Sequence, residues 1–123
     1  MSLPKTVILV VESHPIVRAC MAESLVVAGF DALEVGDASE AISILEARSD
    51  IRLVFTETDI PETKDGLKLA RCIRGRWPPV ILIVVSGRAE VGHGYFPEGT
   101  RFFPKPYHDT AIVQEMVAML VSG

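Results

Sequence analysis

The chain has 123 residues, a length typical of one domain, and 49% of them are hydrophobic. Its formal net charge of -4, from 12 basic and 16 acidic residues, disfavours nucleic-acid binding by this chain alone. No apolar stretch reaches about 18 residues and no basic segment precedes a cleavable apolar one, so we expect neither a membrane span nor a secretory signal.

These features predict a single cytoplasmic domain over residues 1–123. Residues 1–5 are predicted to be disordered or to derive from cloning, and the sequence leaves open whether the native protein continues beyond Gly123. Cys20 and Cys72 fall inside apolar helical patterns without a CxxC motif, and we expect them to be small core residues in a reducing compartment.

Short apolar runs alternate with segments of helical spacing along the chain. The runs predict five strands, at residues 7–11, 32–35, 53–55, 80–85 and 101–103. Four apolar stripes predict helices between and after these strands: Ile16, Val17, Cys20, Met21, Ser24 and Leu25; Ala41, Ile42 and Leu45; Leu67, Leu69, Ala70 and Ile73; and Ile112, Val113, Met116, Val117 and Leu120. Strands followed by helices imply a parallel sheet that is covered on both faces.

Turn-forming and capping residues divide the chain at the same points. They close the first helix, cap the second, precede the third and separate it from the fourth strand: Gly29, Asp37 with Glu40, Asp65 with Gly66, and Pro78 with Pro79. Residues 87–99 are the exception, because four glycines and a proline leave room for at most a turn or two of helix. We expect a loop or a shortened fourth helix there.

Polar side chains follow four of the five predicted strands. They are acids after two strands, a hydroxyl after the next and an ammonium after the last: Glu12 with Ser13, Glu57 with Asp59, Ser86, and Lys105 before Pro106. Because ligands of an open parallel sheet bind beyond the carboxyl ends of its strands, we expect these groups to converge. Carboxylates that face such donors suit a phosphoryl group or a cation.

In this arrangement the sequence resembles the response-regulator receiver domain of two-component signalling, which accepts a phosphoryl group from a histidine kinase on an aspartate. The resemblance runs from residue 7 to residue 120 and is carried, in order, by VILVVESHP, LVFTETDIPETKDGLKLARCIR, VILIVVSG and GTRFFPKPY. It implies a flavodoxin-like, doubly wound (βα)5 domain similar to chemotaxis regulators, with strand order 2-1-3-4-5.

The resemblance also implies a role for each residue of the pocket. Glu57 occupies the phosphoacceptor position, Glu12 and Ser13 occupy the acidic pair that holds Mg²⁺, and Asp59 edges the pocket. The switch and phosphate-binding positions are a hydroxyl, an aromatic ring and a lysine before a cis proline: Ser86, Phe102, Lys105 and Pro106. Strand alternation requires Phe102 and its neighbour Phe103 to point to opposite faces.

The chain departs from the family at the chemical centre. The family has an aspartate at the acceptor and usually an acidic pair after the first strand, whereas this chain has Glu57 and Glu12 with Ser13. Because Mg²⁺ requires near-ideal octahedral geometry at roughly 2.0 to 2.1 Å, we expect Glu12 and Glu57 to bind it weakly or not at all. We expect no other cofactor. Phosphoryl transfer should then be slow or absent, as in a degenerate receiver.

A glutamate at position 57 suggests a different role. Its carboxylate lies farther out than that of an aspartate and could accept hydrogen bonds from Lys105 and Ser86 without a metal, which would hold the domain in an active-like state. Asp59 is an alternative phosphoacceptor, but it follows the strand and approaches Pro61, which puts it on the rim of the pocket.

Several of these residues also have a purely structural interpretation. Ser13 fits the N-cap of the first helix, and Glu12 can neutralise Lys105 or the helix N-terminus. Ser86 with Gly87 fits a turn, and Lys105 taken alone fits a surface lysine. We expect the histidines on the surface, with the first of them nearest the pocket: His14, His93 and His108.

Three functions follow from these alternatives. We predict a non-enzymatic module, catalysing at most its own phosphoryl transfer and hydrolysis, that binds a sensor histidine kinase, a phosphotransfer protein or a downstream effector. A working phosphoreceiver that uses Asp59 or Glu57 with Mg²⁺ is the alternative. A small-molecule-binding domain is a distant third, because ESHP after the first strand has no glycine to cradle a phosphate. Homodimerisation through residues 87–122 is a further option, with contacts there that depart from the family norm.

Overall fold

The structure is a computed structural model that describes residues 5–58, 66–87 and 96–122. In these ranges the strands and helices follow in the order β1 Val7–Val11, α1 Pro15–Val27, β2 Asp31–Val35, α2 Ala38–Ala47, β3 Ile51–Glu57, α3 Gly66–Arg76, β4 Ile81–Ser86, β5 Arg101–Pro104 and α4 Asp109–Ser122. In this described part of the chain, no helix has the length and apolar character needed to span a bilayer.

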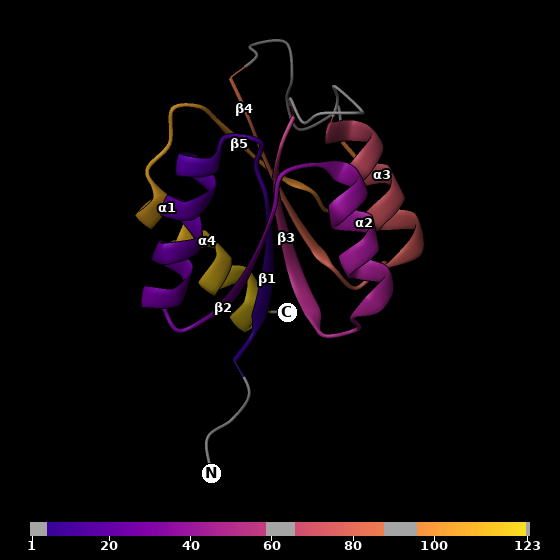
Figure 1. The fold of residues 1–123 in the computed structure, drawn as a ribbon, viewed down its shortest axis with the longest axis horizontal. Coiled ribbons are helices and arrows are strands. Elements are labelled where there is room, and N and C mark those ends of the chain that lie inside the picture. Colours follow the sequence, from indigo (N-terminus) through magenta and orange to yellow (C-terminus); the bar gives the residue numbers. More distant parts are fainter. Residues whose placement is uncertain (1–4, 59–65, 88–95, 123) are drawn as a thin grey trace.

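All five strands are parallel and form one sheet of order β2-β1-β3-β4-β5. Helices α1 and α4 cover one face of this sheet, and α2 and α3 cover the other (Figure 1). This is the doubly wound, flavodoxin-like arrangement, so the predicted fold class and strand order are confirmed. The carboxyl ends of the strands therefore lie along a single edge.

Two apolar cores hold the layers together. Strand β1 is buried at all five positions, with Leu9 and Val11 in the core toward α2 and α3, and Ile8 and Val10 in the core toward α1 and α4. This is the pattern of a central parallel strand that is covered on both faces. The predicted stripe of α3 is buried throughout, and that of α2 is buried at Ala41 and Leu45.

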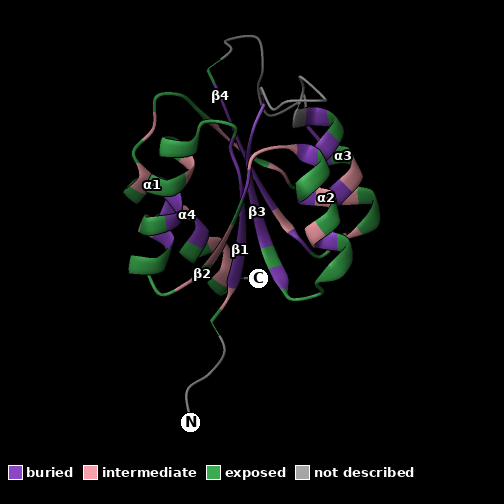
Figure 2. Cartoon of the chain, in the orientation of Figure 1, coloured by how far each residue is buried: buried purple, intermediate pink, exposed green. Residues whose placement is uncertain are grey.

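The predicted apolar stripe of α1 is wrong in part. Met21 and Leu25 are fully buried, whereas Ile16 is 68% exposed and Cys20 is exposed as well. Figure 2 shows that α1 carries both exposed and buried residues. At about 100° per residue, Ile16 and Leu25 lie on opposite sides of the helix, and the sheet covers only the side that carries Leu25. Cys20 is therefore not a core residue, and Cys72 is only half-buried.

The last helix shows a narrower buried face than its spacing predicts. Ile112, Val113 and Met116 are buried, but Val117 is 40% exposed. Val27 of α1 and Val121 of α4 are also exposed. Both helices that cover this face of the sheet therefore carry apolar side chains that face solvent.

Helix α1 begins at Pro15, and its N-cap is His14, whose Nδ1 accepts the Val17 N–H at 3.4 Å. The prediction of Ser13 as the N-cap is therefore wrong, because a proline at the first helical position fixes the cap one residue before it. Helix α2 follows its prediction, with Asp37 Oδ1 accepting the Glu40 N–H at 2.9 Å.

Several expectations fall outside the described residues. They concern the first residues of the chain, Asp59, Asp65, His93 and most of the region 87–99 that was predicted as a loop or short helix. Of that region the structure describes Gly87 and residues 96–99, where Phe96 is buried against the core formed with α2 and α3.

Candidate functional site

Strand alternation sorts the polar groups at the carboxyl edge of the sheet into two sets. Phe55 on β3 packs toward α1 and α4, so Glu57, two residues later, lies on the same side, as does Glu12 after Val10 of β1. Thr58 and Ser86 follow the opposite register, because Val54 and Val84 pack toward α2 and α3. The alternation therefore pairs Glu57 with Glu12.

Glu57 is the centre of the first set. Its side chain is only 6% exposed, and its Oε1 accepts the Ser13 hydroxyl at 2.6 Å and the Ser13 backbone N–H at 3.0 Å. Its Oε2 lies 3.3 Å from Lys105 Nζ, whose side chain is 37% exposed. Ser13 and Lys105 thus hold both oxygens of the carboxylate.

Glu12 lies beside Glu57 and is equally buried, with 3% of its surface exposed. Its Oε1 accepts the His14 backbone N–H at 3.0 Å, so it neutralises the start of α1, as one of the two structural interpretations predicted. Its Oε2 is buried without a hydrogen-bond partner among the described residues. An unsatisfied buried carboxylate oxygen is costly when the group is ionised.

The two carboxyl groups differ in their pKa. Burial, together with the negative charge of Glu57, raises the pKa of Glu12 above its ordinary value, although the His14 N–H opposes the shift. Burial alone would also raise the pKa of Glu57, but the hydrogen bonds from Ser13 and the charge of Lys105 outweigh it and lower that pKa. Glu57 is thus the group held as a carboxylate.

Glu12, Ser13, Glu57 and Lys105 form a group that we call the acidic cluster. Tyr107 packs at its margin. Its ring meets Phe55 edge-on, with the centroids 6.0 Å apart. Burial and the neighbouring carboxylates, Glu12 first among them, raise the pKa of Tyr107, so its hydroxyl stays protonated. Sequence reasoning missed this residue, although it follows the lysine and proline directly.

The second set joins β3 to β4 on the other side of the sheet. Thr58 Oγ1 donates to Ser86 Oγ at 3.0 Å, and both residues are almost fully buried. The Ser86 carbonyl accepts the Lys105 backbone N–H at 2.8 Å. Ser86 is therefore joined through the backbone to the lysine that meets Glu57. The sequence analysis did not predict Thr58 as a site residue, although it follows Glu57 directly at the end of β3.

The aromatic residues of β5 divide as strand alternation predicted. Phe102 packs toward α2 and α3, and Phe103 packs toward α1 and α4. The Phe102 ring is stacked on Phe96 with 6.2 Å between the centroids. The Lys105–Pro106 peptide bond is cis, as the resemblance implied.

The described residues do not fit a Mg²⁺ ion well. Both oxygens of Glu57 are held by Ser13 and Lys105, and the second member of the expected acidic pair is a serine. In the part of the chain that the structure describes, no group of three or more histidine, cysteine, aspartate or glutamate side chains could hold a metal. Among the described residues of the acidic cluster, Glu12 Oε2 is the one side-chain oxygen that is buried without a hydrogen-bond partner. This is a poor donor set for an octahedral ion.

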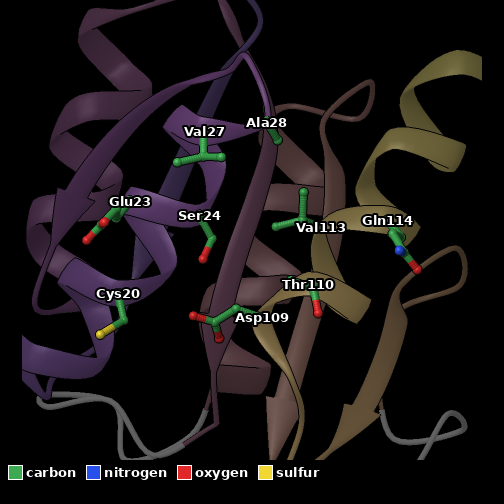
Figure 3. Close-up of a pocket in the computed structure, with 9 residues that line it drawn as sticks. All are labelled: Cys20, Glu23, Ser24, Val27, Ala28, Asp109, Thr110, Val113 and Gln114. Atoms are coloured by element: carbon green, nitrogen blue, oxygen red, sulfur yellow. The ribbon is translucent and has the colours of Figure 1, made fainter.

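A groove of about 480 Å³ lies between α1 and α4. Its lining comes from both helices and includes Cys20, Glu23, Val27, Asp109 and Val113 (Figure 3). None of its lining residues belongs to the acidic cluster. The groove lies on the same face of the sheet as Glu57.

Of the residues predicted for the site, the structure brings Glu12, Ser13, Glu57 and Lys105 together. Ser86 lies at the same edge, but its described side-chain partner is Thr58, and the hydroxyl that bonds Glu57 is that of Ser13. His14 and His108 are exposed, as predicted.

Comparison with known proteins identifies the family of this domain. The family model of the response regulator receiver domain matches residues 8–117. The sensor protein TorS of Escherichia coli (strain K12) is 28% identical over 79 residues, which make up 64% of this chain and 8% of that protein. This chain therefore spans only a small part of that curated relative.

Solved structures share the fold over nearly the whole chain. A response regulator receiver protein from Sinorhizobium medicae WSM419 has a TM-score of 0.86 and 23% identity, with 97% of both chains covered. The receiver domain of the hybrid histidine kinase CckA has a TM-score of 0.78 and 28% identity, with 93% of this chain and 98% of that chain covered. With the family model matching residues 8–117, this chain belongs to the response regulator receiver family.

Proposed function

We propose that this chain is an atypical receiver that signals through protein contacts, with the Glu57 carboxylate standing in for a phosphorylated acceptor. The observation that carries the proposal is the capture of both Glu57 oxygens, by Ser13 at 2.6 Å and by Lys105 at 3.3 Å. Lys105 occupies the phosphate-binding position of the family, so here it already has a negatively charged partner.

The electrostatics of the cluster support a permanent anion at position 57. The hydrogen bonds of Ser13 and the charge of Lys105 lower the pKa of Glu57 despite its burial, so the carboxylate is ionised at neutral pH. The ion pair with Lys105 contributes little net stability, because the desolvation of Glu57 offsets the attraction. Its effect is to fix the position of Lys105 and of the β5 end that follows Phe102.

The same contacts disfavour phosphoryl transfer to Glu57. The hydrogen bonds from Ser13 and Lys105 stabilise the anion and thereby reduce the nucleophilicity of both carboxylate oxygens. The reaction depends mainly on positioning and on charge neutralisation, which the metal site of a receiver supplies and which this set of donors supports poorly. Transfer to Glu57 would be slow or absent.

The proposed module is not an enzyme and works in the cytoplasm through a protein partner. Candidate partners are a sensor histidine kinase, a phosphotransfer protein or a downstream effector, because receiver domains act with such proteins. The chain's similarity to sensor proteins is consistent with a place within or beside a kinase. A homodimer through residues 87–122 stays part of the proposal and is tested by sedimentation equilibrium.

One observation favours a second candidate, a working phosphoreceiver. Glu12 Oε2 is buried without a partner in the described part of the chain, and a cation would satisfy it. In this candidate Asp59 or Glu57 accepts the phosphoryl group with Mg²⁺ bound weakly near Glu12.

Intact mass spectrometry after incubation with a small phosphodonor and Mg²⁺ separates the two candidates. The wild-type chain should gain no phosphoryl mass, whereas Glu57→Asp should gain one if the longer side chain is what prevents transfer. The proposal is wrong if the wild type gains a mass, and Asp59→Ala then tells whether Asp59 is the acceptor.

A further inference from the structure

A second cavity lies at the amino-terminal edge of the sheet, opposite the acidic cluster. Its volume is about 480 Å³, and its walls come from the segment that joins α2 to β3 and the segment that joins α3 to β4. Three arginines and the chain's single tryptophan line it: Arg48, Arg52, Arg76 and Trp77. We call it the arginine pocket. Its lining includes one carboxylate, that of Glu46, so it is basic in a chain of net charge -4.

The three arginines differ in how they are held. Arg48 donates to both oxygens of Asp50, at 2.9 and 2.7 Å, and Arg76 donates to Glu46 at 2.8 Å. Both pairs are exposed, and the single contact between Arg76 and Glu46 exchanges more readily than the two-oxygen contact between Arg48 and Asp50. Arg52 has no hydrogen-bond or ion-pair partner in the described part of the chain.

The wall around these arginines is ordered by its own contacts. The Arg76 guanidinium lies 4.4 Å from the centre of the Trp77 ring, in a cation–π contact. Below it, Arg74 donates to the carbonyls of Pro78 and Val80 at 2.7 and 3.1 Å, which fixes the turn that carries the two prolines. The pocket is therefore preformed on this side.

Helix electrostatics account for some of these arginines. Arg48 is the C-cap of α2, and Arg76 lies in the last turn of α3, where a positive charge offsets the partial negative charge of the helix end. Arg52 is the second residue of β3 and follows no helix end directly. Helix capping therefore does not explain why Arg52 lines the same cavity.

We propose that the arginine pocket binds a small polyanion of the phosphate-ester or polyphosphate class, with Arg52 as its principal ligand. The planar guanidinium offers a fork of donors that matches two phosphate oxygens. A second charge on the ligand meets Arg76, whose single contact with the exposed Glu46 carboxylate exchanges readily. The site is independent of Glu57, because it lies at the other edge of the sheet.

The single tryptophan makes the proposal measurable. The indole N–H cross-peak of Trp77 is followed in ¹H–¹⁵N spectra during titration with inorganic pyrophosphate and, separately, with adenosine monophosphate, at constant ionic strength and without divalent cations. We expect a saturable shift with at least one probe, and tighter binding of the nucleotide would identify a phosphate ester as the preferred class.

Three variants decide the outcome. Arg52→Gln should weaken binding by about tenfold or more, whereas Arg71→Gln, an exposed arginine of α3 away from the pocket, should leave it unchanged. Glu57→Gln should also leave it unchanged, which separates this test from that of the proposed function. A shift that fails to saturate, or one that Arg52→Gln leaves intact, means that the arginines only support the helix ends and overturns the proposal.

Discussion

At the scale of single residues, two buried glutamates side by side have opposite electrostatic roles. Glu57 is held ionised by Ser13 and Lys105, whereas the pKa of Glu12 is raised by burial and by the charge of Glu57. A raised carboxyl pKa means that the fold favours the protonated form, so ionised Glu12 costs stability at neutral pH. A lowered pKa means that Glu57 contributes stability that is lost only as the pH falls through its folded pKa.

The substitution Glu12→Gln should therefore stabilise the domain. The amide keeps an oxygen for the His14 N–H, removes the buried charge and offers an N–H toward Glu57. We expect the free energy of unfolding at pH 7.5 to rise by about 1 to 3 kcal/mol, the cost of a buried unsatisfied acceptor. Urea denaturation across pH measures it.

The gain should be largest above the folded pKa of Glu12 and should vanish below the ordinary glutamate pKa of about 4.3. A variant that is less stable than the wild type at pH 7.5 would show instead that the Glu12 carboxylate is needed, as a cation ligand would be.

Ser13→Ala tests the hydroxyl that holds Glu57. The loss of the 2.6 Å hydrogen bond should cost about 1 kcal/mol and should raise the pKa of Glu57 toward its ordinary value. Carboxyl ¹³C shifts recorded against pH follow Glu57 directly. Ser49→Ala, at an exposed position, is the matched control, and an unchanged Glu57 titration in Ser13→Ala would rule out this role for the hydroxyl.

At the scale of elements, strand patterns were more informative than the α1 pattern. The sequence predicted that Glu12 and Glu57 converge at the strand ends, whereas the side of the sheet that they share follows from the structure, because β1 is apolar at every position and shows no alternating pattern. Helical spacing grouped residues from Ile16 to Leu25 into an apolar band that spans half of the circumference of α1, but spacing does not tell how much of that band the sheet covers. Ser13 was predicted as a cap because the acceptor that its hydroxyl uses, Glu57 Oε1, lies 44 residues away in the sequence. The sequence alone does not show that two residues so far apart in the chain meet in the fold.

The partial burial of α1 predicts unequal responses to substitution. Ile16→Lys should change the free energy of unfolding by less than about 0.5 kcal/mol, because Ile16 is 68% exposed. Leu25→Ala, at a fully buried site on the other side of the helix, should cost roughly 2 to 5 kcal/mol. Thermal and urea denaturation of the two variants check this, and equal losses would mean that both sides of α1 are covered.

At the scale of the whole molecule, the sheet separates two sites of opposite charge. The acidic cluster lies at the carboxyl edge, and the arginine pocket lies at the amino edge. Only the first was visible in the sequence, because its residues follow strands directly and match a family pattern. The arginine pocket is assembled from two segments that join helices to strands, and no local spacing connects Arg52 to Trp77.

We expect the charge of Glu57 to fix the conformation at the carboxyl ends of the strands through its contact with Lys105. The Lys105 backbone N–H donates to the Ser86 carbonyl, and β5 carries Phe102 three residues before Lys105, so the effect of Glu57 should reach both Ser86 and Phe102.

The measurement that tests this most directly is the ¹H–¹⁵N spectrum of Glu57→Gln beside that of Glu40→Gln, an exposed glutamate of α2. Glu57→Gln keeps the shape of the side chain and removes its charge. We expect shifted amides at Ser86 and Phe102 in Glu57→Gln alone. Shifts confined to Ser13 and Lys105 would contradict it.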